Sequence, residues 1–87
     1  MKLSYKGLTE KEALANLTQN VEEQLRREGL EQANFQAFGV DPVGGKVAIR
    51  SQLDIPETFS LNQREMTMKI VGEECAKFRQ QRYGLDV

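Results

Sequence analysis

Segment 39–55, GVDPVGGKVAIRSQLDI, constrains the fold more than any other part of the chain. It joins a cluster of turn residues to a stretch in which apolar side chains recur at every second position. Such alternation is typical of a strand that is buried on one face, and only Ser51 interrupts it. We therefore expect a strand over 46–55. The apolar residues of the series are Val47, Ile49, Leu53 and Ile55.

The residues just before this strand predict a turn that reverses the chain. Asp41, Pro42 and Gly44 stand where a type I turn favours Asp, Pro and Gly. If the loop spans 41–45, the residues before it form the preceding strand of a hairpin. That strand is expected over 33–40.

The register of this hairpin decides which side chains face the core. In the expected register Val40 lies opposite Lys46, and Phe35 shares the buried face with Ile49. The outer face then combines apolar and cationic side chains. This candidate binding set is Phe38, Val40, Lys46, Ala48 and Arg50. Because side chains alternate along a strand, a slip of one residue would exchange the two faces.

The first helix is predicted over 10–28. Thr9 and Glu12 have the spacing of a capping box, and Gly29 is suited to the left-handed residue that ends a helix. Between these signals, apolar residues recur at helical spacing and form a narrow stripe on an otherwise polar helix. The stripe consists of Leu14, Leu17, Val21 and Leu25.

The second helix is predicted over 60–83. Ser60 and Gln63 form another capping-box pattern. The expected core stripe of this helix is Leu61, Met68, Val71, Cys75 and Phe78, widened by Met66 and Ile70. Adjacent glutamates, Glu73 and Glu74, are expected on its solvated face.

These elements predict an α+β fold, a small two-layer (β)αββα sandwich in which two helices pack on an antiparallel hairpin or meander. We expect residues 1–87 to form a single domain. Residues 2–6 also alternate, as either a short strand or an extended lead-in. Residues 52–55 extend beyond the expected partner strand, so segment 2–6 could pair with them within the chain or between chains. A homodimer would also supplement a small core.

The residue types present leave little room for catalysis or metal binding. The chain has no histidine, which is the commonest general base and metal ligand, and one cysteine, Cys75. Cys75 lies on an expected apolar stripe, where a cysteine behaves as a small buried hydrophobe. Neighbouring glutamates on a helix point away from each other. We expect a protein that is not an enzyme, with no catalytic residues, metal or cofactor.

Charge and hydropathy restrict the setting of the protein. Twelve basic residues balance 13 acidic ones, so no large net charge favours nucleic acid or an anionic membrane. No run of 18 apolar residues predicts a membrane-spanning helix, and the first residues lack the apolar core of a signal peptide. We therefore expect a cytoplasmic protein, and its small size also suits a phage protein inside its host.

The expected function is a small protein-interaction module of the adaptor, assembly-factor or inhibitor type. It would act through a sheet face or helix surface, as a homodimer, on a protein partner. The alternative is a nucleic-acid-binding protein. In that case Phe38 would stack on bases, and Lys46 and Arg50 would contact phosphates.

Overall fold

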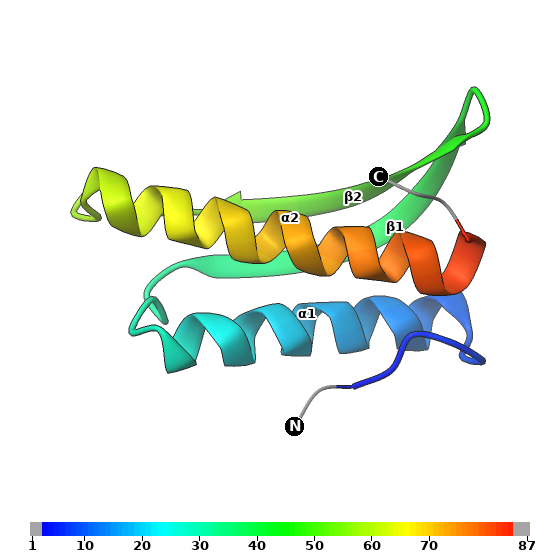
Figure 1. The fold of residues 1–87 in the computed structure, drawn as a ribbon, viewed down its shortest axis with the longest axis horizontal. Helices are drawn as coiled ribbons and strands as arrows, with labels where there is room; N and C mark the ends of the chain where they lie inside the picture. The colour runs from blue at the N-terminus through cyan, green and yellow to red at the C-terminus, as the bar shows by residue number, and fades with distance from the viewer. Residues whose placement is uncertain (1–2, 85–87) are drawn as a thin grey trace.

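The computed structural model describes residues 3–84, in the order helix–strand–strand–helix (Figure 1). The elements are α1 (Glu10–Arg27), β1 (Asn34–Val43), β2 (Lys46–Asp54) and α2 (Leu61–Tyr83). Within the described residues, β1 and β2 form a two-stranded antiparallel sheet. The predicted α+β class is confirmed.

Helix α1 lies at the centre of the packing. It contacts both β1 and α2, and the two helices run antiparallel beneath the hairpin (Figure 1). The core draws on α1 through Leu17 and Val21, on β1 through Phe35 and on α2 through Phe78. Strand β2 contributes only half-buried side chains, such as Ile49. The sheet is therefore well covered along β1 and poorly covered along β2.

The local signals of α1 are all present. Thr9 and Glu12 form the predicted capping box. Gly29 adopts φ +71°, and the Leu30 N–H donates to the Leu25 carbonyl at 2.7 Å, which gives the helix a Schellman end. The whole predicted apolar stripe is buried, namely Leu14, Leu17, Val21 and Leu25.

Helix α2 begins as predicted but packs through a different stripe. Ser60 and Gln63 form the second capping box. Leu61 and Met68, however, are 70% and 63% exposed, while Thr67 and Glu74 are buried. The predicted stripe of α2 was therefore wrong at Leu61, Met66 and Met68, all of which are exposed. Its buried face is turned toward α1 and is partly polar.

The hairpin turns later than predicted. Strand β1 continues to Val43, which lies opposite Lys46, and the turn is Gly44–Gly45. Both glycines have positive φ, at 55° and 79°. A two-residue loop with positive φ at both positions matches the right-handed twist of the flanking strands, and glycine adopts it without strain. The predicted loop over 41–45 and its register were wrong.

A β-bulge at Phe38 changes which side chains face the core. Ala37 pairs with Ser51 and Gly39 with Arg50, so Phe38 is the extra residue. An extra residue shifts the alternation of every side chain beyond it. Val40 therefore lies opposite Ile49 and packs against the core. Its predicted place on the outer face was wrong.

The chain before α1 does not join the sheet. Residues 3–6 form no strand, and Lys2 lies outside the described residues. Strand β2 needs no extra partner at its end, because β1 pairs with it from Asp54 to Lys46. A strand at this N-terminal segment, and an unpaired end at residues 52–54, are therefore not found.

Candidate functional site

Four of the five predicted binding residues are exposed on the outer side of the hairpin. They are Phe38, Lys46, Ala48 and Arg50, and we call this surface the Phe38 face. Phe38 is the unpaired bulge residue just before Gly39, which lies opposite Arg50. Ala48 lies between Arg50 and the turn, and Lys46 stands beside the turn. The fifth, Val40, faces the core.

Arg50 contacts a carboxylate and a glycine of β1. Its Nε lies 2.9 Å from Asp41 Oδ2, in an ion pair between two partly exposed side chains. The guanidinium also lies over Gly39, since a Cβ there would stand 2.3 Å from Arg50 Nη2. A larger side chain at position 39 would displace the exposed end of Arg50. Half of the positive charge on the Phe38 face is thereby paired with a carboxylate.

Phe38 stands where the outer sheet face meets an open groove between α1 and β1. Its side chain is 53% exposed, a large exposed area for an aromatic ring. The groove has more acidic than basic groups along its rim: Glu10, Glu22 and Asp54 against Lys11. At its floor the Ala37 N–H donates to Thr18 Oγ1 at 3.1 Å, which joins the edge of β1 to α1.

Glu74 is the residue that sequence reasoning misplaced most clearly. It is 1% exposed, although it was expected on the solvated face. It accepts hydrogen bonds from the Tyr5 hydroxyl and from Gln24 Nε2, the latter at 2.7 Å. Asn20 Nδ2 in turn donates to the Tyr5 hydroxyl at 2.9 Å. The available signal was its position midway between Ile70 and Phe78 on one helical face.

This buried cluster shifts the protonation of Tyr5. Burial raises the pKa of the Tyr5 phenol far above its usual value, the Asn20 hydrogen bond lowers it in part, and the hydrogen bond to Glu74 raises it further. The phenol therefore stays protonated and remains a hydrogen-bond donor to Glu74. The cluster serves as an anchor for the N-terminal segment.

Side chains of both helices fix the backbone of residues 3–8. Asn20 Oδ1 accepts from the Leu3 N–H, and Asn20 Nδ2 donates to the Leu3 carbonyl, both at 2.9 Å. Arg82 Nη1 donates to the Tyr5 and Leu8 carbonyls, at 3.0 and 2.8 Å. These bonds satisfy backbone groups that a strand would have paired, so the segment is ordered without a sheet.

Potential metal ligands do not cluster in the part of the chain that the structure describes. No group of three or more potential ligand side chains is found in residues 3–84. Cys75 is buried as predicted, and this burial raises the pKa of its thiol. None of the helices in this part of the chain is both long and apolar enough to cross a membrane.

Comparison of the chain with models of protein families, with curated proteins and with solved structures gave no match. Its function is therefore inferred from its surfaces.

Proposed function

We propose that the chain is a small, non-enzymatic protein-interaction module that binds a protein partner through the Phe38 face, as an adaptor, assembly factor or inhibitor in the cytoplasm. The observation that carries the proposal is the exposure of Phe38 on a bulge. Burying an aromatic ring against a partner is among the largest single contributions to a protein interface. Bulges commonly redirect a side chain at a functional site.

The charges around Phe38 favour a protein over nucleic acid. On the outer sheet face, Lys46 and Arg50 are balanced by Asp41 and Asp54. The neighbouring groove has an acidic rim. A nucleic-acid surface needs uncompensated cations, because release of counterions from phosphates supplies most of its affinity. A partner with an apolar pocket and basic flanking groups would fit this surface better.

The proposal includes self-association. A two-stranded sheet is marginal on its own, and β2 is covered on only part of its inner face. A second copy would supply the missing contacts.

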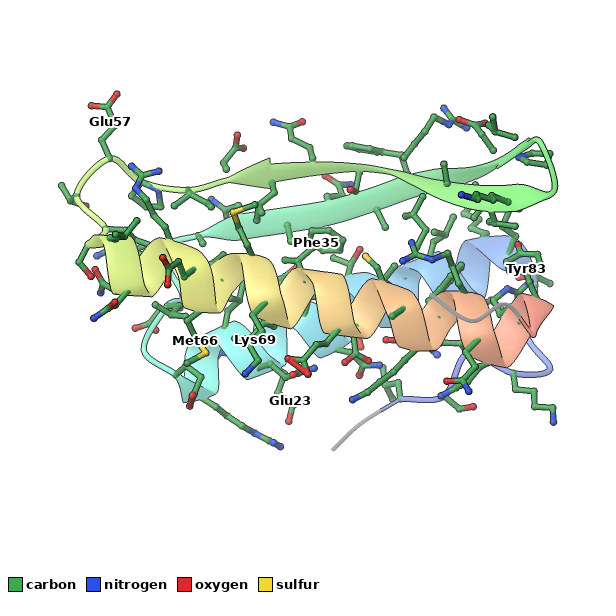
Figure 2. All side chains as sticks on the ribbon, turned by 45° about the horizontal axis from the view of Figure 1, so that its top comes forward. Glu23, Phe35, Glu57, Met66, Lys69 and Tyr83 are labelled. Carbon is green, nitrogen blue, oxygen red and sulfur yellow. The ribbon has the colours of Figure 1, made fainter. Side chains whose placement is uncertain are left out.

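The test of the Phe38 face is affinity capture of tagged protein from its native host, with and without nuclease. The matched variants are Phe38→Asp and Met66→Asp. Met66 is an exposed apolar residue, 40% accessible, on the side of α2 that points away from the hairpin (Figure 2). We expect a protein recovered in a fixed ratio, insensitive to nuclease, lost with Phe38→Asp and retained with Met66→Asp.

Two other outcomes would contradict the proposal. Recovery that nuclease abolishes, with binding that falls steeply with salt and is lost in Arg50→Glu, would establish the nucleic-acid alternative. Equal recovery with both aspartate variants would show that the partner binds elsewhere.

A further inference from the structure

The two edges of the sheet are protected very differently. The outer edge of β1 carries a bulge at Phe38 and a proline at Pro42, and α1 covers part of it through the Thr18 hydrogen bond. Each of these is a known device against pairing with another strand. Strand β2 has neither bulge nor proline over its nine residues, three of which are charged, and no described residue pairs with its outer edge.

The outer edge of β2 also has apolar side chains that are only half covered. Val47, Ile49 and Leu53 point to the inner side of the sheet and are half-buried. Figures 1 and 2 show β2 along the margin of the fold, with neither helix beyond it. A further strand at this edge would cover these side chains and bond the free backbone groups. An exposed edge of this length and composition invites pairing.

We infer that β2 pairs antiparallel with β2 of a second copy, across a two-fold axis at Arg50. The dimer would then contain one four-stranded sheet in the order β1-β2-β2-β1. This inference rests on the self-association in the proposed function. It does not depend on the Phe38 side chain, although β2 also carries Lys46, Ala48 and Arg50 of the Phe38 face.

Backbone geometry selects this register. Lys46 lies opposite Val43 beside a two-residue turn, so it and every second residue after it direct their backbone groups toward β1. The residues between them direct theirs to the free edge; they are Val47, Ile49, Ser51 and Leu53. With Arg50 on the axis, Val47 faces Leu53 of the second copy and Ile49 faces Ser51. In this register each of these four residues lies opposite another of them in the second copy, so their outward N–H and C=O groups can hydrogen-bond across the interface.

The charges along β2 are complementary to themselves in the same register. Lys46 lies opposite Asp54 of the second copy, and the symmetry repeats this pair at the other end of the interface. The two Arg50 side chains meet near the axis, but each is already paired with its own Asp41 at 2.9 Å. Opposite charges directly across two strands stabilise the pairing, while like charges oppose it.

The first test is the oligomeric state by sedimentation equilibrium, on wild type and on Ser51→Pro. Proline is tolerated on an edge strand where the amide points to solvent, so the monomer should fold. It removes an amide that the dimer needs and places its ring in the interface. We expect a wild-type dimer and at least a tenfold weaker dimer, about 1.4 kcal/mol, for Ser51→Pro. Circular dichroism checks that the variant is folded.

A charge exchange tests the register and does not depend on how Ser51→Pro folds. Lys46 and Asp54 stand at opposite ends of one strand, so they cannot contact each other within a monomer. We expect Asp54→Lys to weaken the dimer several-fold and Lys46→Asp combined with Asp54→Lys to restore it.

A monomeric wild type would overturn the inference and leave partner capture through Phe38 to be judged separately. A dimer that the charge exchange does not affect would also overturn it, since the dimer would then form through another surface.

Discussion

The two helices begin with the same kind of capping box but differ in where their apolar residues lie. In α1 the apolar stripe is buried and the remaining surface is polar. In α2 large apolar side chains, Leu61 and Met68, are exposed, while polar Thr67 and Glu74 are buried. The difference follows from their neighbours. Helix α1 packs between β1 and α2, whereas α2 covers the N-terminal segment and binds it through polar groups.

The two helices are held in place in different ways. The central helix, α1, is held mainly by burial of apolar area, which does not depend on direction, with Asn20 as its one buried polar side chain among the described residues. Helix α2 is held in part by hydrogen bonds to one buried glutamate, which require correct geometry and full satisfaction. The same substitution should therefore lower the free energy of unfolding by different amounts in the two helices.

The largest expected effect comes from a pair of leucines, one in each helix. Leu17 of α1 is fully buried, and Leu61 of α2 is 70% exposed. Leu17→Ala should lower the free energy of unfolding by about 4 kcal/mol, because it leaves a cavity in the core. Leu61→Ala should change it by less than about 0.5 kcal/mol. Denaturant unfolding at one fixed protein concentration measures both, and equal costs would remove the distinction between the helices.

The sequence predicted α1 well because every signal for it is local. The capping box spans Thr9 to Glu12, and the Schellman end lies within a few residues of Gly29. The apolar stripe needs only the helical repeat. These features are set by neighbours in the chain, so a single sequence contains the information.

The hairpin was harder to predict, since two turn signals competed. Asp41 and Pro42 favour a type I turn, whereas Gly44–Gly45 favours a two-residue hairpin loop, and the glycines prevail. The bulge at Phe38 has no clear local signature, and it alone moves Val40 to the core side. Alternation along each strand therefore predicts which residues of the Phe38 face are exposed. It cannot predict the side on which a residue beyond the bulge lies, as Val40 shows.

The polar anchor in α2 could not be predicted from spacing alone. Glu74 bonds to Gln24 and Tyr5, which lie 50 and 69 residues away in the sequence. A glutamate beside another glutamate on a helix normally faces solvent. Only the tertiary structure brings together the donors that make its burial favourable.

Adjacent glutamates of α2 provide the second prediction. Glu74→Leu should lower the free energy of unfolding by about 3 kcal/mol, because it leaves the buried donors of Tyr5 and Gln24 without an acceptor. Glu73 is exposed, and Glu73→Leu should cost less than about 0.5 kcal/mol. The two variants make the same substitution at neighbouring positions of one helix, so they form a matched pair. If the two variants unfold at the same denaturant concentration, Glu74 does not anchor the N-terminal segment.

The smallest expected effect is at Tyr5, where a single hydroxyl joins the N-terminal segment to α2. Tyr5→Phe removes its hydrogen bonds to Glu74 and Asn20 and should cost about 1 kcal/mol at neutral pH. The buried hydroxyl of Tyr5 should also make stability depend on pH under alkaline conditions. Burial raises the pKa of Tyr5 in the folded state, so above about pH 10 the unfolded chain loses this proton first.

Stability should therefore fall with rising pH, by up to about 1.4 kcal/mol per pH unit for this one group. Tyr5→Phe removes that contribution, and the difference in unfolding free energy between wild type and variant should shrink from pH 9 to pH 11. Tyr83, the other tyrosine, is 39% exposed, and Tyr83→Phe serves as the control. A constant difference across this range would show that Tyr5 ionises as readily in the folded protein as in the unfolded chain, and the buried anchor of α2 would then not exist in solution.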